Sequence, residues 1–195
     1  MLIAVEGIDG SGKTTIANFL KDFLKKQSYE VVLLKEPSDS KWGKMLKESF
    51  KKGRLPPKKE LEFFILDRKY NVERNIAPAL KSGKIVILDR YYYSTLAYQG
   101  ALGFNIDEIK KINESFAPKP DLVIILDVDP KIAIERIKRK RGGINKFEDL
   151  NYLKKVRSIF LSIKDDNIVV IDANKDLDYV KQEVLKAVSN LIKFR

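Results

Sequence analysis

Residues 7–14 combine the residue types that bind phosphate groups. They read G-I-D-G-S-G-K-T and fit the pattern G-x-x-x-x-G-K-[ST]. Glycines let the backbone turn tightly, so that N–H groups converge on phosphate oxygens without Cβ atoms in the way. The Lys13 ammonium would then reach the β- and γ-phosphates of a nucleotide, and the Thr14 hydroxyl would offer a ligand to Mg²⁺. The alternative interpretation is a glycine turn that joins a strand to a helix and binds nothing.

A strand must precede this loop and a helix must follow it if the loop is to bind phosphate. Residues 2–6 read LIAVE, an apolar run that predicts a buried strand. After the loop, apolar side chains recur at i, i+3, i+4, i+7 and i+8, namely Ile16, Phe19, Leu20, Phe23 and Leu24. This spacing predicts an amphipathic helix whose N-terminal dipole faces the bound phosphate. Both flanking elements therefore favour the phosphate-binding interpretation.

Four more near-continuous apolar runs predict strands, at residues 30–34, 84–88, 122–126 and 168–171. Longer amphipathic segments separate these runs, which is typical of parallel strands covered by helices on both faces. The expected fold class is α/β, a three-layer fold of the P-loop NTPase type with about five parallel strands. Ligands of such sheets lie at the carboxyl ends of the strands. Functional side chains are therefore expected just after the runs, at residues 7–14, 35–37, 89–91, 127–130 and 172–174.

The composition narrows the possible classes of protein. With 195 residues the chain fits a single domain over 1–195, and it contains neither cysteine nor histidine. A disulfide framework, a zinc–thiolate site and a His-ligated metal are therefore excluded, and acid–base chemistry falls to carboxylates, lysines or tyrosines. No apolar run approaches about 18 residues and no signal pattern opens the chain, so we expect a cytoplasmic protein without membrane contact. The net charge of +11 comes from lysines interleaved with acids, which favours a solvated surface over a nucleic-acid partner.

Residues 88–99 read LDRYYYSTLAYQ and closely resemble the D-R-[YF]-x-x-S-x-x-A-Y-Q signature of thymidylate kinases. The phosphate-binding loop, the Glu36-Pro37 pair, the F-x-x-D-R motif at residues 64–68 and a lid region at residues 135–142 follow in the family's order. Beyond about Lys175 the resemblance is only general. It implies transfer of the γ-phosphoryl group of ATP to dTMP, with Mg²⁺ as cofactor, and a homodimer.

The implied reaction explains how a chain without histidine could be an enzyme. A phosphate monoester has a second pKa of about 6, so the acceptor is ionised at pH 7 and needs no general base. Two polyanions must instead be screened and aligned around a loose in-line transition state. Cationic side chains are therefore the expected catalytic groups.

The resemblance assigns roles in acceptor binding to several side chains. Arg68 and Arg90 align with arginines that bind the acceptor phosphate, and the alternative for them is ion pairing with Asp67 or Asp89. Phe64 lies one helical turn before Arg68 and would stack on thymine, unless it is a core residue. The Tyr98 ring would lie beneath the deoxyribose and disfavour a 2′-hydroxyl, and Gln99 would hydrogen-bond base or sugar. At least one of the tyrosines at 91–93 is expected to serve packing.

Carboxylates and a cluster of arginines complete the implied site. Asp9 would bind the acceptor's 3′-hydroxyl, a nearby arginine or Mg²⁺. Asp89 would contact Mg²⁺ mainly through water. Asp127 and the helix-capping pair Asp129-Pro130 are interpreted as structural. Because Gly10 stands where some family members carry a catalytic arginine, the arginine must come from the lid, residues 136–147. Family patterns are broken at Lys35 and Lys146, where arginine is frequent, and at Asn145, where aspartate is frequent.

The implied site therefore consists of the following residues. The catalytic candidates are Lys13, Arg90, Arg139, Arg141 and Asp9. ATP contacts are expected at Gly7, Asp9, Gly10, Ser11, Gly12, Lys13, Thr14, Thr15 and Arg136. Contacts to dTMP are expected at Asp9, Glu36, Pro37, Phe64, Arg68, Arg90, Ser94, Tyr98 and Gln99. Mg²⁺ ligands are expected at Thr14 and Asp89.

Two other functions remain open. A deoxynucleoside kinase would phosphorylate a neutral 5′-hydroxyl, which needs a carboxylate base, and Glu36 stands where such a base can sit in related kinases. Those kinases usually carry Glu-Arg-Ser where this chain has Asp89-Arg90-Tyr91. A basic ATPase stimulated by nucleic acid is the second alternative, motivated by the net charge. The sequence does not determine the discrimination between dTMP and dUMP, which differ by one methyl group.

Overall fold

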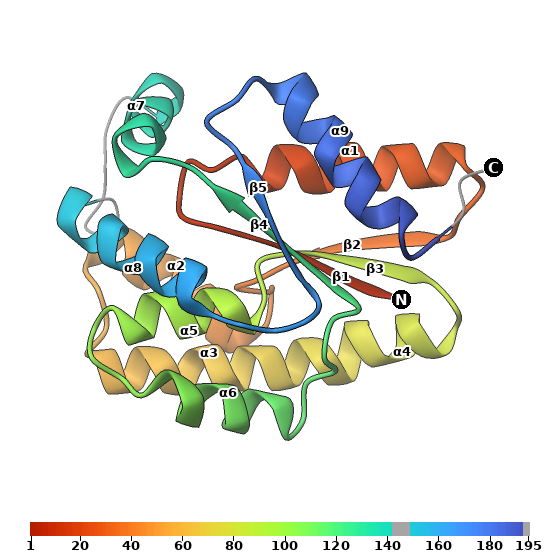
Figure 1. The fold of residues 1–195 in the computed structure, drawn as a ribbon. Coiled ribbons are helices and arrows are strands. Elements are labelled where there is room, and N and C mark those ends of the chain that lie inside the picture. The colour runs from red at the N-terminus through yellow and green to blue at the C-terminus, as the bar shows by residue number, and fades with distance from the viewer. Residues whose placement is uncertain (142–148, 193–195) are drawn as a thin grey trace.

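The computed structural model describes residues 1–141 and 149–192, and its centre is a parallel β-sheet (Figure 1). The sheet has five strands in the order β2-β3-β1-β4-β5. The strands are β1 (Leu2–Glu6), β2 (Val31–Lys35), β3 (Ile85–Asp89), β4 (Leu122–Asp127) and β5 (Ile168–Asp172). The predicted α/β fold class is thereby confirmed.

Helices cover both faces of the sheet. They are α1 (Lys13–Lys26), α2 (Lys41–Lys52), α3 (Pro57–Asn71), the π-helix η1 (Val72–Ile76), α4 (Ala77–Lys81), α5 (Tyr92–Gly100), α6 (Ile106–Glu114), α7 (Pro130–Arg141), α8 (Leu150–Ser162) and α9 (Leu177–Ser189). Figure 1 shows α1 and α9 above the sheet and the α3, α5, α6 and α8 layer below it. Among the residues that the structure describes, no helix is long and apolar enough to cross a membrane.

The central strands are buried because both of their faces are covered. Strands β1 and β3 are buried along their whole length, which explains why they read as continuous apolar runs. The register places Val5 of β1 beside Asp89 of β3 and Ile124 of β4. The phosphate-binding loop therefore leaves the sheet next to the last residue of β3.

The strand predicted at residues 2–6 has the bounds of β1, but the other four predicted strands end one residue too early, because backbone pairing continues through their polar last residues. Lys35 at the end of β2 pairs with Asp89, and Asp127 at the end of β4 pairs with Asp172. Parallel hydrogen bonding uses main-chain groups and does not require an apolar side chain at the last position. Asp89, Asp127 and Asp172 thus belong to the strands, and their backbone positions are fixed by the sheet.

The residues at the starts of α3 and α8 explain where these helices begin. Proline occupies the first helical position of α3, at Pro57. Helix α8 begins at Leu150, and the Asp149 carboxylate caps it by accepting from the Tyr152 N–H at 2.9 Å.

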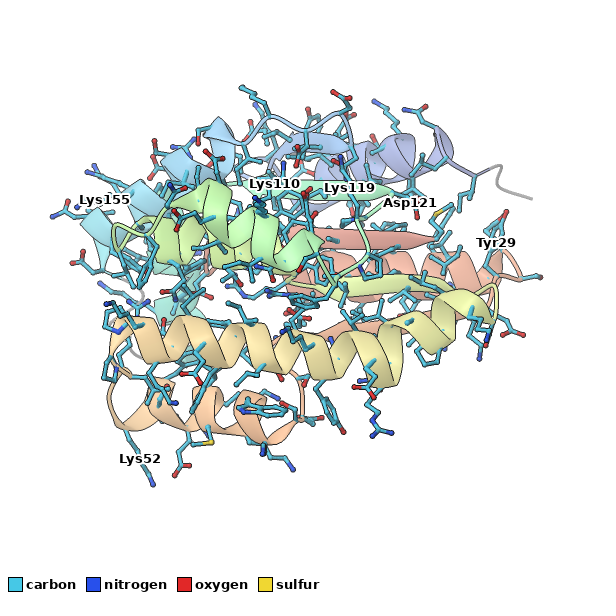
Figure 2. All side chains as sticks on the ribbon, turned by 90° about the horizontal axis from the view of Figure 1, so that it is seen from below. Tyr29, Lys52, Lys110, Lys119, Asp121 and Lys155 are labelled. Carbon is cyan, nitrogen blue, oxygen red and sulfur yellow. The ribbon has the colours of Figure 1, made fainter. Side chains whose placement is uncertain are left out.

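Charged side chains are distributed over the molecule rather than gathered on one element. In Figure 2 the labelled Lys52, Lys110, Lys119 and Lys155 come from α2, α6, the segment before β4 and α8. Some pair with nearby acids, as Lys52 does with Glu48 at 2.6 Å. Exposed pairs of this kind contribute little to stability, because water and salt screen the charges. Their distribution fits a solvated surface.

Candidate active site

The loop between β1 and α1 has the backbone that phosphate binding requires. Gly7, Gly10 and Gly12 all have positive φ values, which residues with a Cβ rarely adopt. A Cβ at Gly10 would overlap the carbonyl group of Ala133 on α7. No arginine fits at position 10 while α7 packs there, as expected for a chain that takes its catalytic arginine from elsewhere.

Lys13 begins α1 and is buried within the loop. Its Nζ donates to the carbonyl oxygen of Ile8 at 2.7 Å. Burial, together with the nearby charge of Arg90, lowers the pKa of Lys13 to about 7, against the attraction of Asp9 and Asp89. An ammonium group in this setting gains stability from added negative charge, which a nucleotide phosphate would supply.

The candidate Mg²⁺ ligands Thr14 and Asp89 lie together at the start of α1 and the end of β3. The Thr14 hydroxyl donates to Asp89 Oδ2 at 2.5 Å, and the Lys35 ammonium lies 3.1 Å from the same oxygen. Although burial acts to raise it, the Thr14 hydrogen bond and nearby cations hold the pKa of Asp89 below its usual value. Asp89 Oδ1 is buried and has no hydrogen-bond partner among the residues that the structure describes. A carboxylate and a hydroxyl form the oxygen donor set that Mg²⁺ prefers, so these residues fit the ion.

Hydrogen bonds from Arg90 and Tyr98 stabilise the negative charge of the Asp9 carboxylate. Arg90 Nη2 donates to Asp9 Oδ1 at 2.6 Å, and the Tyr98 hydroxyl donates to Asp9 Oδ2 at 3.1 Å. The Asp9 N–H in turn donates to the Tyr98 hydroxyl oxygen at 3.0 Å. A carboxylate inside a phosphate-binding loop is thereby neutralised, and the loop is tied to helix α5.

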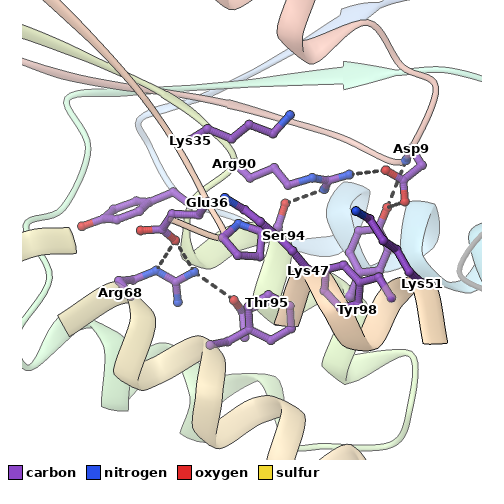
Figure 3. A pocket seen from close by; sticks show the side chains of 14 residues that line it. Asp9, Lys35, Glu36, Lys47, Lys51, Arg68, Arg90, Ser94, Thr95 and Tyr98 are labelled. Carbon is purple, nitrogen blue, oxygen red and sulfur yellow. Dashed lines mark hydrogen bonds and ion pairs between the residues drawn. The ribbon is translucent and has the colours of Figure 1, made fainter. Parts of the chain in front are cut away.

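A pocket of about 440 Å³ opens beside Asp9, between the ends of β2 and β3 and helices α2, α3 and α5 (Figure 3). It is lined by Asp9, Lys35, Glu36, Pro37, Lys47, Phe50, Lys51, Phe64, Arg68, Arg90, Tyr91, Ser94, Thr95 and Tyr98. Every residue expected at dTMP lines this pocket except Gln99. The pocket has the size of a small-ligand site.

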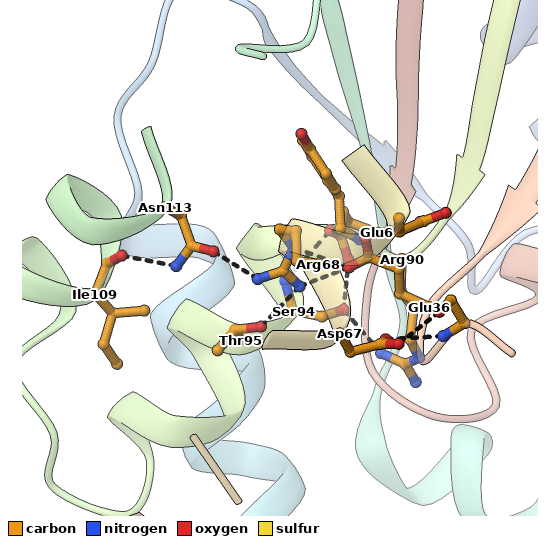
Figure 4. Close-up of polar contacts among 12 residues, drawn as sticks. Glu6, Glu36, Asp67, Arg68, Arg90, Ser94, Thr95, Ile109 and Asn113 are labelled. Carbon is orange, nitrogen blue, oxygen red and sulfur yellow. Dashed lines mark hydrogen bonds and ion pairs between the residues drawn. The ribbon is translucent and has the colours of Figure 1, made fainter. Parts of the chain in front are cut away.

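Arg68 is held by a buried carboxylate rather than by Asp67 or Asp89. Its Nε and Nη2 donate to Glu36 Oε2 at 2.9 and 2.6 Å. The remaining bonds go to Asn113 Oδ1 at 2.6 Å and Thr95 Oγ1 at 3.0 Å (Figure 4). Burial raises the pKa of Glu36, and Arg68 opposes that rise. The charge of Arg68 is therefore already balanced within the chain.

Asp67 has a separate role in holding the loop after β2. Its carboxylate accepts from the Ser38 N–H at 2.8 Å, from the Ser38 hydroxyl at 2.5 Å and from the Ser40 hydroxyl at 2.6 Å. Ser40 caps α2. Two adjacent residues of α3 thus hold the loop after β2. Asp67 binds Ser38 and Ser40, and Arg68 binds Glu36.

Aromatic side chains form the apolar part of the pocket. Phe64 is only partly buried and lines the pocket, whereas its neighbour Phe63 belongs to the core. The rings of Phe64 and Phe50 lie 6.3 Å apart. The interpretation of Phe64 as a core residue is therefore wrong. Its ring lines the pocket and is accessible to a flat ligand.

Gln99 and the three consecutive tyrosines are buried around α5. Gln99 donates to Glu60 Oε1 at 2.7 Å and does not line the pocket. Within the described part of the chain, its own Oε1 is buried without a hydrogen-bond partner. Tyr92 and Tyr93 stack at 4.5 Å, and their hydroxyl groups reach Glu114 and Asp165. Of the three tyrosines, Tyr91 alone lines the pocket. The expectation that some of these tyrosines serve packing is confirmed.

The lid arginines are described only in part. Arg136 donates to the Ala173 carbonyl oxygen at 3.0 Å, which ties α7 to the loop after β5. Arg139 is exposed on α7. Arg141 ends that helix, but its side chain and residues 142–148, with Asn145 and Lys146, lie outside the described residues. Thr15 is exposed in the first turn of α1, beside the loop that contains Ser11.

Asp127 and Asp129 have structural partners. Arg157 of α8 binds the Asp127 carboxylate with two hydrogen bonds, at 2.6 and 2.9 Å. Asp129 Oδ1 accepts from the Lys131 N–H at 2.7 Å, and α7 begins at Pro130. Both contacts agree with the structural interpretation of these aspartates.

Sequence reasoning missed several residues of the site. Lys47, Phe50 and Lys51 line the pocket from one face of α2, and their spacing of three and four residues is a signal that could have been used. Thr95 also lines the pocket, but it stands at a variable position of the family signature on α5 and was not assigned a role.

These features define a P-loop nucleotide kinase. The glycine loop follows the central strand β1, Asp89 ends the adjacent strand β3, and the pocket beside them is lined by two arginines. A family model described as thymidylate kinase matches residues 5–184. The chain belongs to the thymidylate kinase family, and it is an ATP-dependent nucleoside monophosphate kinase.

Similar proteins support this membership over nearly the full length. A probable thymidylate kinase of Archaeoglobus fulgidus is 52% identical over 195 residues, covering 100% of this chain and 98% of that protein. A thymidylate kinase of Xanthomonas campestris pv. campestris is 44% identical, covering 94% of this chain and 80% of that protein. A thymidylate kinase of Xylella fastidiosa is 40% identical, covering 100% of this chain and 93% of that protein.

Proposed function

We propose that this chain transfers the γ-phosphoryl group of ATP to dTMP, with donor and acceptor meeting at Arg90. The observation that carries the proposal is the position of this guanidinium, which bonds to Asp9 of the phosphate-binding loop and also lines the pocket. One cation would therefore contact the phosphates on both sides of the transfer. Lys13 would contact the donor phosphates from within the loop.

On the donor side we propose that loop N–H groups and Lys13 hold the ATP phosphates, with further contacts from Thr15 and Arg136. Thr14 and Asp89 would hold Mg²⁺, whose charge would neutralise phosphate oxygens. Lys35 now pairs with Asp89, and its ammonium would turn toward a phosphate once a metal ion takes its place. We further propose that residues 1–195 form one kinase domain, with the lid over residues 136–147.

On the acceptor side we propose that thymine stacks on Phe64 and that the sugar lies over Tyr98. Both arginines are paired with a carboxylate, but Arg90 is the better candidate for the acceptor phosphate, because its side chain is 16% exposed and that of Arg68 only 1%. The ammonium groups of Lys47 and Lys51 at the pocket rim would add positive charge. Arg68 would then line the pocket as a neutralised pair rather than act as the main phosphate ligand.

A phosphate acceptor fits Glu36 better than a nucleoside acceptor does. A base for a 5′-hydroxyl needs a carboxylate oxygen free to take a proton. Glu36 instead accepts bonds on both oxygens, from Arg68 and from Asn71 Nδ2 at 3.1 Å, and its side chain is 3% exposed. This arrangement supports dTMP over thymidine as the acceptor.

ADP release with ATP and Mg²⁺ tests the proposed function, with dTMP, dUMP, dCMP, UMP and thymidine offered in parallel. We expect the highest kcat/KM with dTMP, because an ionised phosphate meets Arg90 and a thymine ring meets Phe64. We also expect dUMP to exceed UMP, since the Tyr98 ring would exclude a 2′-hydroxyl. Activity on thymidine without activity on dTMP would contradict the proposal and make Glu36 the presumed base.

Removal of divalent metal should abolish turnover, and added Mg²⁺ should restore it. Asp89→Asn should raise the Mg²⁺ concentration needed for half-maximal rate by about 10- to 100-fold, the usual cost of weakening a metal site. The control is Asp127→Asn, which changes the aspartate that ends β4, on the other side of β1 from β3, and that binds Arg157. An unchanged Mg²⁺ requirement in Asp89→Asn would contradict the metal assignment.

We propose that the chain acts as a homodimer in the cytoplasm, where its donor ATP is available. Exposed apolar side chains support a partner surface on one side of the molecule, with Met45 on α2, Tyr70 on α3 and Ile112 on α6 each 40% exposed or more. In Figure 2 these three helices lie next to each other on the side facing the viewer. Light scattering should give twice the chain's mass of 22.4 kDa, and a monomeric mass would contradict the proposal.

A further inference from the structure

Glu6 is a fully buried carboxylate that no role described so far uses. It closes β1, directly before the phosphate-binding loop. Its Oε1 accepts from the N–H groups of Tyr91 at 2.7 Å and Ser94 at 3.2 Å, and its Oε2 accepts from the Ser94 hydroxyl at 2.5 Å (Figure 4). All of these donors lie at the start of α5.

Helix α5 depends on Glu6 for its cap. The N-cap residue Tyr91 supplies no side-chain hydrogen bond to the first turn. The carboxylate of Glu6 reaches this turn from β1, and a negative charge at a helix N-terminus also interacts favourably with the helix dipole. The start of α5 is therefore held to β1 by Glu6, in addition to the Asp9–Tyr98 hydrogen bonds that tie α5 to the loop.

The same contacts fix the backbone of Arg90. Its φ of 77° lies in the left-handed region, which arginine adopts at an energetic cost. The Arg90 N–H donates to the Val5 carbonyl oxygen at 3.1 Å, and the next N–H, that of Tyr91, donates to Glu6. The peptide groups on both sides of Arg90 are thus held by consecutive residues of β1.

The guanidinium of Arg90 is fixed through Ser94. Arg90 Nη1 donates to the Ser94 hydroxyl oxygen at 2.9 Å. Because the Ser94 hydrogen is donated to Glu6, the lone pairs of that oxygen are left to accept from Arg90. Glu6 therefore determines the direction of the Ser94 hydroxyl and, through it, the position of the guanidinium.

We propose that Glu6 is a positioning residue for phosphoryl transfer, which holds both the backbone and the guanidinium of Arg90 in the geometry that binds the acceptor phosphate. This inference rests on the proposed role of Arg90. Electrostatics support it: burial raises the pKa of Glu6 to about 7, and the Ser94 hydrogen bond and the Arg90 charge oppose that rise. The two charged groups stabilise each other.

Glu6→Gln is the variant that tests this inference. Glutamine keeps the size of the side chain and can still accept from the N–H groups, but its amide N–H₂ cannot accept from the Ser94 hydroxyl. We expect kcat/KM for dTMP to fall about 100-fold, the cost of a small misplacement in an active site, while KM for ATP stays unchanged. A rise in KM for ATP in step with the loss would overturn the inference, because Glu6 would then act through the phosphate-binding loop.

A double-mutant cycle with Arg90→Lys separates positioning from a general effect on folding. If Glu6 acts through Arg90, then Glu6→Gln should cost almost nothing further in the Arg90→Lys protein. An equal fold-loss in both backgrounds would overturn the inference. If Arg90→Lys alone leaves kcat/KM for dTMP unchanged, the proposed role of Arg90 fails and the inference fails with it, whereas a wild-type chain inactive on dTMP would contradict the proposed function itself.

Two further variants keep the test decisive if Glu6→Gln does not fold. Ser94→Ala removes only the hydroxyl link, and its effect on kcat/KM for dTMP should also vanish in the Arg90→Lys background. Asp121→Asn is the matched control, because Asp121 Oδ2 accepts from the Leu2 N–H at 2.7 Å at the opposite end of β1. We expect its kinetics to equal those of wild type, and a comparable loss there would assign the effect to strand β1 as a whole.

Discussion

Alanine at both Arg139 and Arg141 should lower kcat with dTMP by about a thousandfold, because an arginine that stabilises the transferring phosphoryl group contributes about that much or more. The phosphate-binding loop offers no substitute, since a side chain at Gly10 would overlap Ala133. KM for dTMP should change little, because the pocket residues that bind the acceptor remain. Steady-state ADP release measures both quantities.

The matched control for that variant is alanine at Lys138 and Lys140, which removes the same charge from the same helix. We expect this control to keep most of the wild-type kcat. An equal loss in both proteins would indicate a general need for positive charge rather than a catalytic arginine. Full activity of the Arg139 and Arg141 variant would place the catalytic arginine elsewhere, and the two single variants would rank them if activity is lost.

Arg68→Met should destabilise the protein by about 3–5 kcal/mol at pH 7, because it leaves the Glu36 carboxylate buried without its cation. Urea unfolding measures the free energy of unfolding. The loss should shrink as the pH falls toward 5: burial raises the pKa of Glu36, so the folded variant binds a proton more readily than the unfolded chain and gains stability on acidification.

The double variant Glu36→Leu with Arg68→Met is the control for the buried pair. Replacing both partners with apolar side chains removes the unpaired charge, so we expect it to be more stable than Arg68→Met alone. Equal destabilisation of the single and double variants at every pH would contradict the argument. The loss would then arise from packing around α3 rather than from charge.

The sheet and the phosphate-binding loop could be predicted because their signals are local. A strand, a glycine loop and an amphipathic helix follow each other within about the first 25 residues, and parallel strands bring their carboxyl ends to one edge. This rule alone predicts that Asp9, Glu36, Asp89 and Arg90 share one region of the molecule. The strand ends were misjudged by one residue because pairing is a main-chain property.

The pairing of charged residues could not be predicted in the same way. The sequence offered Asp67 and Asp89 as partners of Arg68, because Asp67 precedes it in the chain and Asp89 belongs to the family signature at residues 88–99. The actual partner is Glu36, 32 positions away, and Asp67 binds Ser38 and Ser40 instead. Which carboxylate meets which cation depends on how α3 lies against the loop after β2, and no periodic pattern encodes that contact.

Helix α5 shows a second limit of sequence reasoning. Its residues from Tyr92 to Gln99 are all buried, so it has no polar face from which to read an orientation. The Tyr98 side chain lines the pocket, whereas the Gln99 side chain donates to Glu60. No spacing rule distinguishes these two buried residues. The family signature identified this helix correctly, but only the packing of its neighbours determines which of its side chains face a ligand.

The left-handed backbone of Arg90 has a consequence for protein engineering. By conformational preference alone, position 90 would suit glycine, which adopts a positive φ without the penalty of about 1 kcal/mol that other residues incur. A redesign that scores each position by backbone compatibility would select against this arginine, as it would against Ser28, which also has a positive φ. If Arg90 has the role proposed above, a thermostabilised version of this enzyme must exempt position 90 from optimisation, since backbone preference and catalysis would make opposite demands on that residue.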